Sequence, residues 1–144
     1  MGKKLPYILA VLLLVLVGIS IYAVTQQNKN NQERAKPASL QGQSEHWKVT
    51  VVMVGDGKQS VVKPTAQYNG LDKLAELIVT VNYKDNTSTS FTAVQPDMYD
   101  NQTPYDPDPQ AADKSWMDVQ NVQVAWKVGD KPYKEFMNVE NKAQ

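Results

Sequence analysis

The longest apolar segment of the chain covers residues 6–24, PYILAVLLLVLVGISIYAV, and contains no charged residue. Lys3 and Lys4 lie just before it, separated from it only by Leu5. About 18 residues of this segment would form a helix roughly 27 Å long, close to the hydrocarbon core of a bilayer at roughly 30 Å. The pattern predicts an N-terminal transmembrane helix within residues 1–24, with membrane contact through residues 6–24.

Two outcomes are open for this segment, a retained anchor and a cleaved signal peptide. The apolar core of a signal peptide is usually about 7–15 residues, shorter than this run. Ile21 is also bulky for the small residue that cleavage after Ala23 would need. We therefore expect a retained single-pass anchor, with a secreted soluble domain as the alternative. The two lysines before the run favour an N-terminus inside the cell and a C-terminal domain outside it.

Residues 25–43 are polar and nearly free of large apolar side chains. Such a segment buries too little apolar surface to offset the entropy lost when it becomes ordered. We expect a flexible linker here. Continuation of the helix to about Arg34 is the alternative, since Gln, Lys, Glu and Arg are acceptable helix formers.

Residues 44–141 change to a pattern with period 2, in which Trp47, Val49, Val51 and Met53 alternate with more polar positions. This alternation is typical of strands with one buried face. Pro64 cannot donate a ladder hydrogen bond, so its strand is expected at an edge or with a bulge. Turn residues divide the segment into six predicted strands, at about 47–54, 59–68, 74–83, 88–94, 116–127 and 133–139. The fold class is all-β: a small antiparallel β-sandwich of immunoglobulin-like size, with a small open barrel as the alternative.

Composition removes several functions from consideration. The 15 basic and 15 acidic residues balance, so there is no net basic charge of the kind that nucleic-acid binding requires. The chain has no cysteine, which excludes disulfides, thiol catalysis, cysteine-based zinc sites and a lipid anchor on cysteine. Trp47 and Trp126 lie in series with valines, and we expect both in the core.

Candidate chemistry is sparse. The one histidine, His46, is expected to be solvated at the start of the first strand, and no hydrolase, metalloprotease or phosphate-loop motif is present. We predict no catalytic residue and no cofactor. The long loop at 95–115 is rich in acids, and carboxylates are the ligands that Ca²⁺ prefers. Its weak calcium candidates are Asp97, Asp100, Asp106, Asp108 and Asp113, against the simpler interpretation of a solvated loop. Three aromatic residues in or after this loop form a candidate contact surface: Tyr99, Tyr105 and Trp116.

Two short segments carry a resemblance to known proteins. Residues 44–49, SEHWKV, and residues 124–129, VAWKVG, resemble small membrane-anchored or lipoprotein-like extracytoplasmic β-domains of Gram-positive, bacillus-type bacteria. Many of those domains carry a lipid-attachment cysteine, which this chain lacks. The resemblance implies a location outside the cell membrane and a β fold, and it transfers no catalytic residue.

These observations together predict a membrane-anchored binding or accessory module at the bacterial cell envelope. Its partner would be an envelope protein or polymer, not nucleic acid. A secreted soluble β domain is one alternative. An enzyme that acts on cell-wall material through carboxylates is the other, because acidic residues are scattered through the chain.

Overall fold

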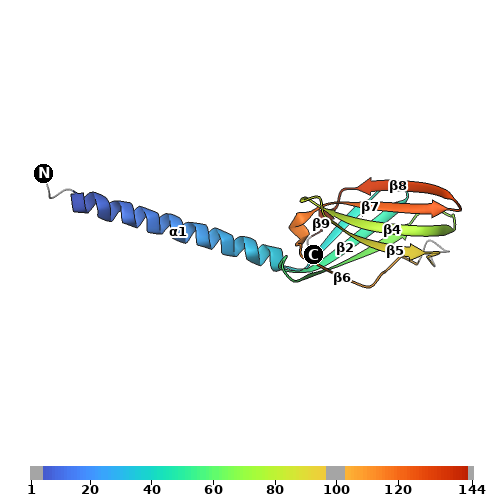
Figure 1. Cartoon of the computed structure of the whole chain (residues 1–144), viewed down its shortest axis with the longest axis horizontal. Helices are drawn as coiled ribbons and strands as arrows, with labels where there is room; N and C mark the ends of the chain where they lie inside the picture. The colour runs from blue at the N-terminus through green and yellow to red at the C-terminus, as the bar shows by residue number, and fades with distance from the viewer. Residues whose placement is uncertain (1–4, 97–102, 143–144) are drawn as a thin grey trace. The chain divides into compact units, whose positions relative to one another are not determined.

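The computed structural model describes residues 5–96 and 103–142, and the chain divides into two compact units, residues 1–33 and 34–144. The first unit is formed by helix α1 (Leu5–Ala35), which continues past the apolar run (Figure 1). The polar residues 25–35 are thus helical, which agrees with the alternative that the helix continues to about Arg34. Val11–Ala35 is long and apolar enough to span a membrane, although a signal sequence has the same properties.

The second unit is a β-sandwich, which confirms the predicted fold class (Figure 1). One sheet has the strand order β6-β3-β2-β1-β9 and the other the order β5-β4-β7-β8, and every strand pair in both is antiparallel. The strands that the structure describes are β1 (Ala38–Gln43), β2 (Trp47–Gly55), β3 (Ser60–Tyr68), β4 (Leu74–Tyr83), β5 (Ser88–Val94), β6 (Gln110–Ala112), β7 (Val119–Val128), β8 (Lys131–Met137) and β9 (Glu140–Asn141).

All six predicted strands are present, as β2, β3, β4, β5, β7 and β8, and three short strands are additional. The most consequential is β1, which occupies the end of the expected linker. It pairs with β2 from Ala38 opposite Met53 to Gln43 opposite Lys48. The prediction of a flexible linker over residues 25–43 is therefore wrong, because the end of α1 and strand β1 occupy most of this segment. Backbone hydrogen bonds to the edge of β2 order this polar segment, and such bonds require no apolar alternation in the partner.

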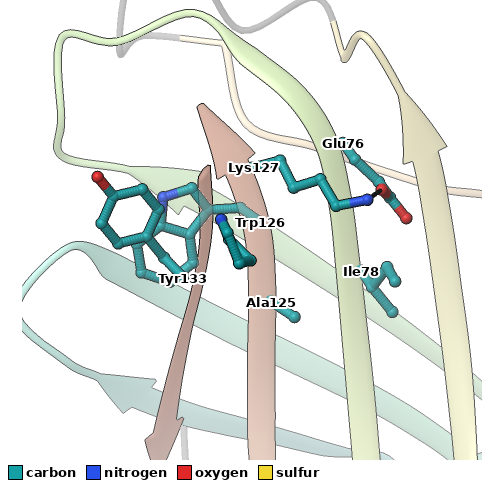
Figure 2. Close-up of a pocket in the computed structure, with 7 residues that line it drawn as sticks. Glu76, Ile78, Ala125, Trp126, Lys127 and Tyr133 are labelled. Carbon is teal, nitrogen blue, oxygen red and sulfur yellow. Dashed lines mark hydrogen bonds and ion pairs between the residues drawn. The ribbon is translucent and has the colours of Figure 1, made fainter. Parts of the chain in front are cut away.

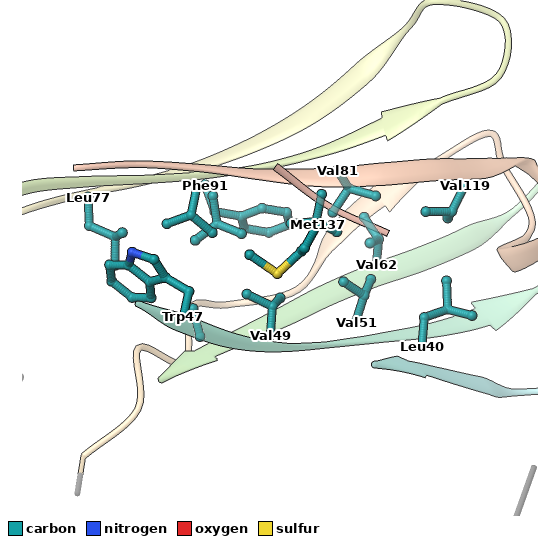
Figure 3. Close-up of a cluster of buried hydrophobic side chains, with 14 of the residues drawn as sticks. Leu40, Trp47, Val49, Val51, Val62, Leu77, Val81, Phe91, Val119 and Met137 are labelled. Carbon is teal, nitrogen blue, oxygen red and sulfur yellow. The ribbon is translucent and has the colours of Figure 1, made fainter. Parts of the chain in front are cut away.

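The core lies between the two sheets and is built from the alternating positions (Figure 3). Along β2 every second side chain is buried, and the same alternation holds along β4 from Leu77 to Tyr83. Burial of each such valine or leucine stabilises the fold by about 1.5–3 kcal/mol relative to exposure. Trp47 is 0% exposed and Trp126 is 4% exposed, which confirms that both tryptophans belong to the core.

Strand β3 shows how the sheet accommodates proline. Pro64 lies opposite Val51 of β2, whereas the short strand β6 pairs with β3 only at Ser60, Val61 and Val62. Neither β6 nor the later bridge between Ala66 and Tyr105 pairs with Pro64 itself. Pro64 is therefore paired on the β2 side only, as a residue of an edge strand would be. Strand β3 as a whole lies inside the sheet, between β6 and β2.

Candidate functional site

The acidic loop supplies ion pairs to the sandwich at the positions that the structure describes. Asp106 forms an ion pair with Lys63, with 3.0 Å between Oδ1 and Nζ, and accepts a hydrogen bond of 3.2 Å from the Thr65 hydroxyl. Asp108 and Asp113 are exposed. Asp97 and Asp100 lie outside the described residues. Calcium binding by this loop stays a prediction, and a rise in melting temperature with millimolar Ca²⁺ would support it.

The predicted contact aromatics are partly covered. Tyr105 and Trp116 are both half-buried and pack against the core, and the Tyr105 backbone exchanges two hydrogen bonds with Ala66 of β3. Trp116 begins the short 3₁₀ helix η1 (Trp116–Asp118), which leads into β7. Tyr99 lies outside the described residues. A contact surface made of these three aromatics therefore stays a prediction.

The structure instead assembles a polar cluster around Glu135, a half-buried carboxylate on β8. Three donors from the turn before β2 bind it. The Ser44 hydroxyl donates to Oε2 at 2.6 Å, and the His46 backbone N–H donates to the same oxygen at 3.2 Å. The His46 ring atom Nδ1 lies 2.5 Å from Oε1. His46 does lie at the start of the first predicted strand, but it is ion-paired and not simply solvated.

The ionisation of this pair follows from its contacts. The hydrogen bond to Glu135 raises the pKa of His46 above its usual 6.5, against a smaller opposing effect of burial. For Glu135, burial tends to raise the pKa, but the hydrogen bonds from Ser44 and His46 together outweigh it and the pKa is lowered. Both shifts favour a charged pair. This pair joins the turn before β2 to β8 and thereby links the two sheets.

An aromatic cluster adjoins the ion pair. The Tyr133 ring stacks on Trp126 with 5.4 Å between centroids and 14° between planes. The Trp126 ring lies 5.7 Å from the His46 ring and 5.5 Å from Trp47. The Lys131 ammonium lies 5.1 Å from the centroid of Tyr133. Stacked aromatic pairs of this kind contribute roughly 0.5–1.5 kcal/mol beyond their buried area, so the cluster stabilises this part of the sandwich.

A shallow apolar pocket lies beside the aromatic cluster on the β4-β7-β8 sheet (Figure 2). Its volume is about 80 Å³. The Lys127 ammonium donates to Glu76 at 2.6 Å, and this contact raises the pKa of Lys127. Ligand pockets usually have about 300–1,000 Å³, so this hollow would accept only a small group. It is lined by Glu76, Ile78, Ala125, Trp126, Lys127, Pro132 and Tyr133.

A larger hollow, which we call the β1 groove, lies along the edge of the other sheet. Its volume is about 340 Å³, and its lining is polar: Gln41, Gly42, Gln43, Lys48, Asn138, Glu140 and Lys142. Within the described part of the chain, none of its six polar side chains forms a hydrogen bond or an ion pair. The β1 groove contrasts with the Glu135 cluster, where every contact is internal.

The chemistry open to the Glu135 cluster is limited by these contacts. Ligand atoms of Glu45, His46 and Glu135 lie within 4.8 Å of one another, and one nitrogen with two carboxylates would suit a divalent metal. However, both Glu135 oxygens and His46 Nδ1 are already engaged. In a serine hydrolase the imidazole lies between the hydroxyl and the acid. Here Ser44 and His46 bind the same carboxylate, so the hydroxyl is not aligned for activation.

Neither the Glu135 cluster nor the β1 groove was predicted from the sequence. Glu135 and His46 are 89 residues apart, and no local pattern relates them. The groove depends on β1, where the apolar alternation is limited to Ala38 and Leu40, and on the two-residue strand β9. Comparison with protein-family models, curated proteins and solved structures finds no match to this chain.

Proposed function

We propose that the protein is a membrane-anchored extracytoplasmic module of the bacterial cell envelope that works by binding. The observation that carries this proposal is the apolar surface of α1. From Val11 to Val17 every residue is Val or Leu, and each side chain is at least half exposed. Seven consecutive helical residues cover nearly two turns and therefore point in every direction around the axis. A helix that is apolar on all sides is suited to lipid and not to the surface of a soluble domain.

The β-sandwich supports a binding role more than a catalytic one. Hydrolysis of a glycan by a carboxylate pair needs one carboxyl group that is protonated and can donate its proton. The pKa of Glu135 is lowered, which is opposite to that requirement. The unpaired polar side chains of the β1 groove are available to a partner, and such a module would contact an envelope protein or polymer close to the membrane.

The proposed orientation rests on Lys3 and Lys4, which lie nearer the apolar run than Lys29, Arg34 and Lys36 do and favour a cytoplasmic N-terminus and an external sandwich. The direct test expresses the full chain with a C-terminal epitope in a Gram-positive host. We expect the protein in the membrane fraction after alkaline carbonate washing, with an N-terminal peptide from residues 1–24 detectable by mass spectrometry. Protease added to intact protoplasts should remove the epitope.

Two variants with the same kind of change provide the control. Val15→Arg places a charge at the centre of the apolar run and should release much of the protein from the membrane, because a central arginine costs about 2.5–3.5 kcal/mol on insertion scales. Leu71→Arg adds the same charge at a side chain that is 94% exposed on the sandwich, and should have no effect. A shortened protein in the medium would support the secreted alternative. A protected epitope on intact protoplasts would contradict the orientation.

A further inference from the structure

The β1 groove lies where strand β9 is short and residue 42 is glycine. β9 pairs with β1 only at Leu40 and Gln41, so β1 extends beyond its partner. The chain that leads from β8 to β9 then passes close to Gly42. A Cβ at Gly42 would lie 2.8 Å from the Asn138 carbonyl oxygen and 3.0 Å from the Val139 side chain. The hollow thus lies beside a close backbone approach in which both Gly42 and Asn138, two of its lining residues, take part.

The lining combines groups that donate and accept hydrogen bonds. Gln41, Gln43 and Asn138 carry amides, each of which offers both donors and an acceptor. Register places Gln43 opposite Lys48 on β2, and Gln41 opposite Glu140 on β9. The amides therefore lie between side chains of opposite charge, along the length of β1.

The ligand that this lining fits has to supply several hydrogen-bonding groups and some negative charge. No aromatic or large apolar side chain lines the groove, so an apolar ligand would gain little there. Sugar hydroxyls both donate and accept, which matches the amides. Two lysines against one glutamate leave one positive charge in excess, which favours an acidic substituent on the sugar.

We propose that the β1 groove binds an acid-bearing oligosaccharide, with the amides of Gln41, Gln43 and Asn138 contacting hydroxyls and Lys48 and Lys142 contacting the acidic groups. This inference rests on the proposed binding function and names the class of its ligand. A volume of about 340 Å³ lies within the range of ligand sites, at its lower end. The groove is open along β1, so longer chains can extend beyond it.

The test is calorimetric titration of the full chain in lipid nanodiscs, with empty nanodiscs as the blank. Three probes separate the contributions: trigalacturonate carries hydroxyls and acids, maltotriose carries hydroxyls alone, and triglutamate carries acids on a peptide. Trigalacturonate should bind most tightly. Lys48→Gln should weaken it by about two- to fivefold, as expected for an exposed charge contact. Gln41→Ala should weaken it by about two- to tenfold, as expected for a lost hydrogen bond.

Matched variants outside the groove provide the controls. Lys58→Gln removes a charge in the exposed turn between β2 and β3, and Gln120→Ala removes an exposed amide on β7. Both should bind trigalacturonate like the wild type. Equal binding of triglutamate and trigalacturonate would overturn the sugar assignment, and unchanged binding by the groove variants would overturn the location. If trigalacturonate fails to bind a protein that is correctly anchored and external, this inference fails while the anchored location stands.

Discussion

The buried indole of Trp47 offers the sharpest test of the energetics of the core. Trp47 is 0% exposed, and its Nε1 has no hydrogen-bond partner among the described residues. A buried donor without a partner costs about 1–3 kcal/mol of desolvation free energy. By contrast, Trp126 does not carry such a group among the described residues, and its ring packs against those of Tyr133 and Tyr68 at 5.4 Å and 6.3 Å between centroids. The two tryptophans thus differ in that Trp47 alone buries an N–H without a partner in the described part of the chain.

Substitution by phenylalanine separates the two cases. In Trp47→Phe, the smaller ring loses about 1–2 kcal/mol of burial and packing free energy. Removal of the unpaired N–H recovers about 1–3 kcal/mol, so the net change should lie between about 1 kcal/mol of destabilisation and about 2 kcal/mol of stabilisation. In Trp126→Phe the ring loss is similar, no unpaired buried N–H is removed in return, and the stack with Tyr133 is reduced. That substitution should destabilise the domain by about 2–3 kcal/mol.

Urea unfolding of the full chain in nanodiscs, followed by the circular dichroism of the β-strands, measures both changes without relying on tryptophan fluorescence. Burial alone predicts the reverse order, because Trp47 is less exposed than Trp126. The reasoning is refuted if Trp47→Phe costs clearly more than about 1 kcal/mol or at least as much as Trp126→Phe.

Three further predictions follow from particular contacts. Gly42→Ala should destabilise the sandwich by about 1–3 kcal/mol, because its Cβ would lie 2.8 Å from the Asn138 carbonyl oxygen; an unchanged urea midpoint would contradict this. Leu77→Ala should cost about 2–5 kcal/mol in the same assay, since Leu77 is 0% exposed between the sheets, and a loss below 1 kcal/mol would argue against this packing. The pKa of His46 is raised from 6.5 and that of Glu135 is lowered from 4.5. The pair therefore stabilises the folded domain most between about pH 4.5 and 6.5, and its contribution falls as the pH rises through the raised pKa of His46. Glu135→Gln should therefore lower the melting temperature more at pH 5.5 than at pH 8.5, by an effect of at most about 1 kcal/mol for this half-exposed pair, and an equal loss at both values would count against the ion pair.

The sequence by itself was sufficient for the features that depend on neighbouring residues. The apolar run predicted the first part of α1, as far as Val24, and the alternation along β2 predicted which side chains of that strand are buried. Both patterns are local, because the direction of a side chain in a helix or strand follows from its position within a few residues. The turn residues between strands added the boundaries, and six strands with one apolar face each favoured a two-sheet sandwich over a small open barrel.

Only the tertiary structure decided which distant segments meet. β1 contains few apolar residues and is a strand because the edge of β2 supplies its hydrogen bonds. The expected linker was therefore drawn through residues 38–43, which belong to the sandwich. Glu135 met His46 through the packing of the two sheets, and the β1 groove formed where a short β9 and Gly42 let the chain pass close to β1. Such contacts depend on the pairing of strands far apart in the chain, and a one-residue shift in register would send each side chain to the opposite face.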